Sequence, residues 1–202
     1  MPRDPLLPSG DDRGPRDLRS EVAAAAAGLI ADHALDYASA KFKAAESLGC
    51  AGMRQSLPDN EDIDAALLAH LQLFDEDHEA RVRRRREVAL ELMEMLSDHD
   101  PMLTGAVWKG IVAEHAPIHL QAFSDNAKDL AIDLLNRNIR FDAVTVPHLS
   151  GRGEAEALAF FWRDEPVLLA TYDRREMRSA PRKGSRPAER GSRQALIEKL
   201  RT

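Results

Sequence analysis

Residues 101–123 read PMLTGAVWKGIVAEHAPIHLQAF. A short apolar segment, Met102–Thr104, leads into Gly105, and Gly110 closes the turn that follows. From Ile118 onward apolar and polar residues alternate, which predicts a β-strand because successive side chains of a strand point to opposite faces. The stretch therefore predicts a strand, a glycine-punctuated loop and a second strand. One face of that second strand carries Ile118, Leu120 and Ala122, and the other carries Pro117, His119 and Gln121.

This stretch resembles the core motif of nucleotidyltransferases of the DNA-polymerase-β-like superfamily. In that motif a Gly-Ser pair ends the first strand, a basic residue and a glycine follow in the loop, and the next strand opens with Asp-Ile-Asp-Leu. Gly105-Ala106 stands at the Gly-Ser pair, Lys109-Gly110 stands in the loop, and residues 116–120, Ala-Pro-Ile-His-Leu, begin the second strand. The resemblance implies a mixed α/β sheet with flanking helices.

The resemblance extends over residues 85–146 and includes a later strand. Residues 141–145, Phe-Asp-Ala-Val-Thr, are similar to the strand that carries the family's third carboxylate, which here is Asp142. The chain is also similar to a group of short, uncharacterised bacterial proteins that read close to Leu-Thr-Gly-Ala-Val followed by Ile-His-Leu-Gln. Both likenesses point to the same fold.

The sequence departs from the family where the metal-binding chemistry is expected. Two aspartates at positions i and i+2 of a strand lie on one face and hold Mg²⁺, but this chain has Pro117 and His119 there. Proline offers no ligand, and imidazole suits Mg²⁺ poorly because Mg²⁺ prefers oxygen. We therefore expect a degenerate nucleotidyltransferase-like protein that binds a nucleoside triphosphate or a partner, without efficient Mg²⁺-dependent catalysis. Its nucleotide-binding residues are then Gly105, Ala106, Lys109, Gly110 and Gln121.

Three alternatives remain open at this stage. The first is an active nucleotidyltransferase in which His119 and Asp142 are catalytic and hold one Mg²⁺ or Mn²⁺ ion. The second is a site for Zn²⁺ or Mn²⁺, which would draw on His and carboxylate side chains at Glu114, His115, His119, Asp142 and His148. The third is an interaction scaffold that works through the helical unit or the basic tail and makes no use of the sheet.

Composition sets outer limits on these functions. The chain has 202 residues, a net charge of −6 and 44% hydrophobic residues, which is typical of a soluble domain with no membrane span. The single cysteine, Cys50, excludes an internal disulfide and fits the cytoplasm. From Arg174 to Thr202 there are ten Lys/Arg and three Asp/Glu, a net charge of +7, so residues 1–173 carry −13. The acidic body argues against a duplex-binding groove, whereas the tail is a candidate for contact with nucleic acid or an acidic protein.

The chain divides into four parts by pattern. We expect a disordered leader over residues 1–17, a helical unit over 18–76, the nucleotidyltransferase-like α/β core over 77–173, and a basic tail with a short terminal helix over 174–202. Helical periodicity and capping residues predict helices at 17–30, 37–48, 59–74, 77–97 and 126–136, and the strand at 141–146 is followed by a hairpin that pairs 157–162 with 167–172.

A run of arginines lies inside the helix predicted at 77–97. Arg81 and residues 83–86 are flanked by acids, which favours a solvent-exposed helix face whose arginines form ion pairs. Contact with nucleic acid is the alternative interpretation. Four consecutive arginines point to every side of a helix, so at least one must lie near the core and bury its aliphatic stem.

Overall fold

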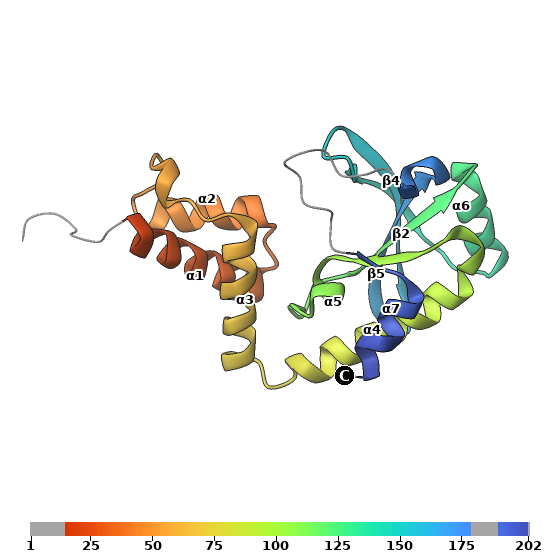
Figure 1. Ribbon diagram of the computed structural model, residues 1–202, viewed down its shortest axis with the longest axis horizontal. Helices are drawn as coiled ribbons and strands as arrows, with labels where there is room; N and C mark the ends of the chain where they lie inside the picture. Colours follow the sequence, from red (N-terminus) through yellow and green to blue (C-terminus); the bar gives the residue numbers. More distant parts are fainter. Residues whose placement is uncertain (1–14, 179–189, 202) are drawn as a thin grey trace, which may run out of the picture. The chain divides into compact units, whose positions relative to one another are not determined.

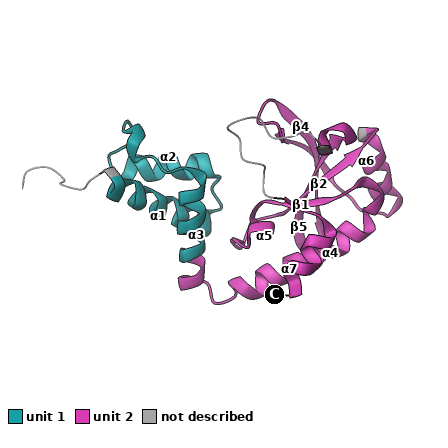
Figure 2. Cartoon of the chain, in the orientation of Figure 1, with its two compact units in different colours: residues 1–70 teal, residues 71–202 magenta. Residues whose placement is uncertain are grey.

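The computed structural model describes residues 15–178 and 190–201, and it divides into two compact units (Figures 1 and 2). The first unit covers Met1–His70 and the second Leu71–Thr202. The mixed α/β class predicted from the sequence is confirmed. None of the helices in the described ranges is long and apolar enough to cross a membrane.

The first unit is helical, as predicted. It contains α1 (Pro15–His33), α2 (Tyr37–Ser47), the 3-10 turn η1 (Arg54–Ser56) and most of α3 (Asn60–Phe74). The leader predicted over residues 1–17 lies outside the described residues up to residue 14, but Pro15 to Asp17 form the first turn of α1. Proline fits this position because the first helical N–H has no partner within the helix.

Small side chains let the helices of the first unit pack closely. The buried apolar residues of this unit include alanines of α1 and α2, among them Ala26 and Ala40, and Ile63 and Leu67 of α3. Two sets of polar contacts also join these helices, one of them to the buried Asp64. The Arg19 guanidinium pairs with Asp59 and Asp62, and the Tyr37 hydroxyl donates to Asp64 Oδ1 at 2.5 Å.

The second unit is built on a mixed sheet of six strands within the described ranges. Its strands are β1 (Met102–Thr104), β2 (Ile118–Ser124), β3 (Asp142–Pro147), β4 (Glu154–Trp162), β5 (Glu165–Asp173) and β6 (Arg190–Gly191). Its helices and turns are α4 (His78–Met95), η2 (Ser97–His99), α5 (Gly105–Lys109), α6 (Ala127–Asn136), η3 (Arg174–Arg178) and α7 (Arg193–Arg201).

The strand order is β3-β4-β5-β2-β1-β6. Only β2 and β5 are parallel, and the other neighbours are antiparallel. The predicted hairpin is β4 and β5, and its two-residue turn places Arg163 and Asp164 at φ values of 52° and 66°. Positive φ at both central residues is the geometry that matches the right-handed twist of antiparallel strands.

The two faces of the sheet are covered unequally. The face of Leu103, Ile118, Leu120 and Leu169 packs against α4, α6 and α7 in one large apolar core. The opposite face holds a smaller cluster around Phe123 and Tyr172, which is covered by Leu149 and by Met177 of η3. The alternation read from residues 117–122 is therefore confirmed, with Ile118, Leu120 and Ala122 in the large core.

The segment between β1 and β2 is more ordered than the predicted loop. Gly105–Lys109 form the short helix α5, which ends at Gly110 with φ of 81°. The Arg86 side chain donates to the carbonyl oxygens of Val107 and Trp108, so α4 supplies partners for the end of α5. Sequence spacing alone did not indicate the short helix, because Arg86, which binds its end, lies about twenty residues earlier in the chain.

The C-terminal residues belong to the core, which differs from the separate basic tail predicted over 174–202. Arg190 and Gly191 pair with β1, and α7 packs against α4 through Leu196. The backbone of Gly191 lies close to the Trp108 side chain, and a Cβ built on Gly191 would lie 2.0 Å from the Trp108 ring. The remainder of that predicted tail, residues 179–189, lies outside the described residues.

Candidate functional site

The arginine run in α4 fixes the loop that leads into β2. Arg85 is 4% exposed, pairs with Glu165 at 2.7 Å and donates to the carbonyl oxygens of Ala113, Glu114 and Ala116. Arg81 donates to Asp75 and to the carbonyl oxygen of Val112. The expectation that one arginine of the run is buried is confirmed. These contacts give Arg81 and Arg85 a structural role, so nucleic-acid contact receives no support from them.

The structure brings some of the predicted nucleotide-binding residues together at the end of β1. Gly105 has a φ of 70°, and a Cβ built there would lie 3.4 Å from the Cβ of His119. His119 pairs with Thr104 across β1 and β2, and burial lowers the pKa of its imidazole below the ordinary value of 6.5. The His119 imidazole makes no hydrogen bond or ion pair with any residue in the described ranges. It is thus a neutral, partly buried imidazole.

The other residues of this predicted cleft are already engaged. Gln121 is buried, and its Oε1 accepts a hydrogen bond from Arg190. The N–H groups of Gly110 and Ile111 both donate to the carbonyl oxygen of Ala106, so neither is available to a phosphate. Lys109 is exposed at the end of α5. The C-terminal N–H groups of the predicted phosphate cradle therefore serve the end of α5.

His119 and Asp142 do not meet. Across the sheet, His119 pairs with Leu168, Leu168 with Ala159, and Ala159 with Asp142, so two strands separate β2 from β3. Three steps of about 4.8 Å place their backbones roughly 14 Å apart. A shared metal ion needs ligand atoms about 2 Å from the metal, so this arrangement gives no support to a metal ion shared by His119 and Asp142, and the pair stays a prediction.

The wider His and carboxylate set does not gather either. Glu114 and His115 are exposed in the loop before β2, and His148 follows the far end of β3, where it contacts Glu176. Among the described residues no group of three His, Cys, Asp or Glu side chains is placed to hold a metal ion. The separation follows from the sheet order, which places β4 and β5 between these elements.

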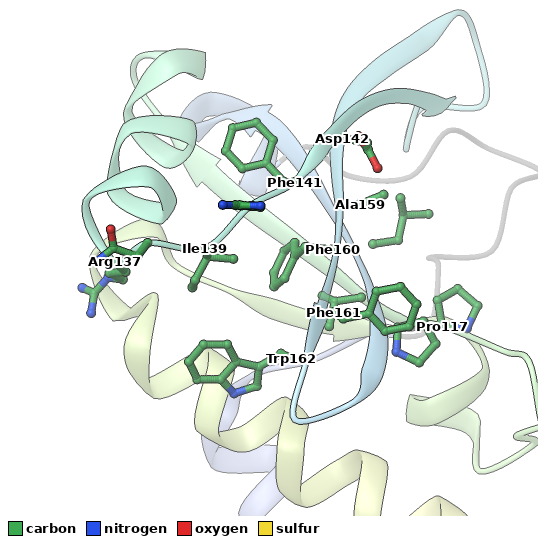
Figure 3. Close-up of a pocket in the computed structure, with 14 residues that line it drawn as sticks. Pro117, Arg137, Ile139, Phe141, Asp142, Ala159, Phe160, Phe161 and Trp162 are labelled. Carbon is green, nitrogen blue, oxygen red and sulfur yellow. The ribbon is translucent and has the colours of Figure 1, made fainter.

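A groove of about 670 Å³ lies where β3 stops short of the end of β4 (Figure 3). Pairing between these strands begins at Asp142 and Ala159, so Phe160, Phe161 and Trp162 have no partner on that side. We call this the edge groove. Leu168, Ala159 and Asp142 lie in one row with His119, and Phe161 and Pro166 pair further along the same face. The groove is also lined by Pro117, Arg137, Ile139, Arg140, Phe141, Phe160 and Trp162.

The edge groove combines aromatic surface with guanidinium groups. Phe161 is 74% exposed, and Figure 3 shows its ring beside Pro117, with Phe141 and Asp142 at the start of β3. Arg137 pairs with Asp133 at 2.9 Å, whereas Arg140 makes no hydrogen bond or ion pair with the described residues. The groove therefore offers a flat apolar surface and one uncommitted positive charge.

Of the predicted site residues, Asp142 alone lines the edge groove. The aromatic residues were missed, although the sequence carries a signal for them. Phe160, Phe161 and Trp162 are consecutive in a strand, so Phe161 must face away from its two neighbours, and only one face of β4 was needed for the main core. An exposed large aromatic residue was therefore implied by the run.

No protein family model matches this chain, and neither curated proteins nor solved structures include a significant match to it. The likeness to nucleotidyltransferases therefore depends on the motif residues alone.

Proposed function

We propose that this protein is a degenerate nucleotidyltransferase-like module that binds a nucleoside triphosphate in the edge groove and does not transfer its nucleotidyl group. The observation that carries the proposal is the pairing of an exposed aromatic ring, Phe161, with an uncommitted guanidinium group, Arg140, in one groove. The groove replaces the β1–α5–β2 turn as the binding site.

The groove's dimensions and chemistry suit a nucleotide. Pockets for small ligands span roughly 300–1,000 Å³, and a base stacked on an aromatic side chain contributes about 1–3 kcal/mol. Guanidinium groups bind phosphate through paired, charge-assisted hydrogen bonds. We assign the base to the Phe161 and Pro117 side of the groove, and the phosphates to Arg140, with Arg137 as a second cation that is already paired.

The absence of transfer is part of the same proposal. Two-metal nucleotidyl transfer requires carboxylates that hold both ions next to the triphosphate. On the face of β2 that carries the motif, this chain presents Pro117 and His119, and the neighbouring parallel strand adds Leu168 and Ala170. The donor set on these two strands does not fit Mg²⁺. Asp142 is a single carboxylate on β3, at the far edge of the sheet.

Calorimetric titration with ATP, GTP, CTP and UTP tests this function. The wild-type protein should bind at least one nucleotide, and Phe161→Ala should weaken that binding by about 5-fold or more, equivalent to the loss of one stacking contact. Phe42→Ala is the matched control, because Phe42 is also exposed, at 63%, but belongs to the first unit. Equal loss in both variants, or no binding by the wild type, would overturn the proposal.

A further inference from the structure

A second cluster of reactive side chains lies at the opposite end of β3 from the edge groove. His148 and Ser150 stand in the loop between β3 and β4, and Glu176 comes from η3, which follows β5. The loop is closed by hydrogen bonds from His148 N–H to the carbonyl oxygen of Gly153 and from Gly151 N–H to that of His148. Gly151 and Gly153 have φ values of 72° and 75°, which glycine adopts without strain.

The contacts around His148 fix its tautomer. The backbone N–H of Ser150 donates to His148 Nδ1 at 3.1 Å, so Nδ1 must be the acceptor nitrogen. The proton of the neutral imidazole is then on Nε2, which lies 3.1 Å from Glu176 Oε2. The second oxygen, Glu176 Oε1, accepts from the backbone N–H of Asp173, and the Tyr172 ring packs against the imidazole in a T-shaped arrangement with ring centroids 5.3 Å apart. The imidazole is therefore held from three sides.

This arrangement places the Nδ1 lone pair, which also accepts from the Ser150 backbone N–H, beside a hydroxyl group. Ser150 Oγ lies 2.8 Å from His148 Nδ1, closer than its other acceptor, the carbonyl oxygen of Arg152 at 3.4 Å. Serine is a weak nucleophile by itself and becomes a good one when an adjacent base accepts its proton and a third group orients that base. Ser150, His148 and Glu176 stand in that relation, and the Ser150 side chain is exposed.

We propose that Ser150 is an activated nucleophile that attacks activated acyl esters, with His148 as general base and Glu176 as its positioning residue. Ser150 Oγ forms a bond to the ester carbonyl carbon while its proton passes to His148 Nδ1. The bond from that carbon to the leaving oxygen then breaks, and the leaving group takes the proton from His148. A water molecule then forms a bond to the acyl carbon while its proton passes to His148 Nδ1. The bond from that carbon to Ser150 Oγ breaks, Ser150 Oγ recovers the proton from His148, and the acid is released. Glu176 stabilises the imidazolium that forms in each step.

Labelling of the full chain with a fluorophosphonate probe tests the nucleophile directly. In this reaction Ser150 Oγ forms a bond to phosphorus, the phosphorus–fluorine bond breaks, and fluoride leaves. Peptide mass spectrometry should place the label on Ser150, and His148→Gln should lower the labelling rate by about 100-fold, the lower end for a lost general base. Glu176→Gln should lower the maximal labelling rate while leaving the half-saturating probe concentration unchanged, which a merely structural role would not do.

Ser39→Ala is the control, because Ser39 Oγ also bonds a charged partner, Asp36, but has no imidazole beside it. Thermal melting of each variant checks that the fold is kept. A label on another residue, no label under conditions that label a known serine hydrolase, or equal labelling of His148→Gln would each overturn the assignment. None of these results bears on the edge groove, since the two sites share no residue.

Discussion

His119 and Asp142 lie in one row and on one face of the sheet, with Leu168 of β5 and Ala159 of β4 between them. The motif in the sequence supplied both residues, but the strand order separates them. Because the β4–β5 hairpin occupies the position next to β2, the strand that carries Asp142 is moved to the edge. The same displacement leaves the end of β4 unpaired and so creates the edge groove.

The first prediction concerns metal dependence. Because His119 and Asp142 are three strand positions apart, the affinity for a nucleotide should be the same in Mg²⁺ and in EDTA, and the double variant His119→Ala, Asp142→Asn should bind as much Mn²⁺ as the wild type. Electron paramagnetic resonance of free Mn²⁺ measures this. Loss of bound Mn²⁺ in the double variant would show that the two residues do share an ion.

The second prediction concerns the buried arginine. Arg85→Ala removes one of the two arginines that pair with Glu165, the other being Arg84, and leaves the carbonyl oxygens of Glu114 and Ala116 without their side-chain donor. The free energy of unfolding should therefore fall by about 3 kcal/mol in urea denaturation. Arg83→Ala is the matched control, since Arg83 forms only an exposed pair with Glu87, worth less than about 0.5 kcal/mol. Similar effects of the two substitutions would contradict the clamp assigned to Arg85.

The third prediction tests whether the C-terminal segment belongs to the core. Gly191→Ala drives a methyl group into the Trp108 ring, so it should cost about 3 kcal/mol and shift the Trp108 fluorescence emission to longer wavelength. Gly52→Ala, where the added methyl group meets nothing within 4 Å, should change stability by less than about 0.5 kcal/mol. A tolerated Gly191→Ala variant would mean that β6 does not pack on Trp108.

The fourth prediction concerns acid stability. The hydrogen bond from Arg81 lowers the pKa of Asp75 below its ordinary value of 3.8. The folded state therefore releases this proton more readily than the unfolded state, so the stabilisation is complete above the unfolded pKa and is lost as pH falls through the folded one.

Asp75→Asn should therefore be less stable than the wild type by about 1 kcal/mol well above the ordinary Asp pKa of 3.8, and the difference should shrink as pH falls below that value and through the folded-state pKa of Asp75. Urea denaturation across this range measures it. A stability difference that does not change with pH would assign the effect to packing instead of charge.

The sequence predicted most elements of the fold because their signals are local. Alternation gave β2, β4 and β5, and capping residues with apolar periodicity gave α2 and α6. Local patterns carry no information on which strands become neighbours, so the position of β3 at the edge was not predicted. The pairing of Arg190 with the sheet was missed for the same reason, since its partner Thr104 lies far away in the chain.

The candidate site was predicted only in part. The motif placed Gly105, His119 and Asp142 in one cleft. In the structure Gly105 lies beside His119, whereas Asp142 lines the edge groove, which contains neither of them. The motif could not show that the N–H groups of Gly110 and Ile111 serve α5, because that depends on the helix that forms there. The cluster of Ser150, His148 and Glu176 was also not predicted, because Glu176 comes from another element of the fold.

The most direct test of the proposed function is calorimetric titration of ATP into the wild type, Arg140→Glu and Lys128→Glu at matched ionic strength. Lys128 is an exposed cation on α6 that does not line the edge groove, so it controls for net charge. We predict that the wild type and Lys128→Glu bind alike, and that Arg140→Glu binds about 10-fold more weakly or worse, as expected for a lost charge-assisted hydrogen bond. Equal affinity of Arg140→Glu and the wild type would contradict the edge groove as the nucleotide site.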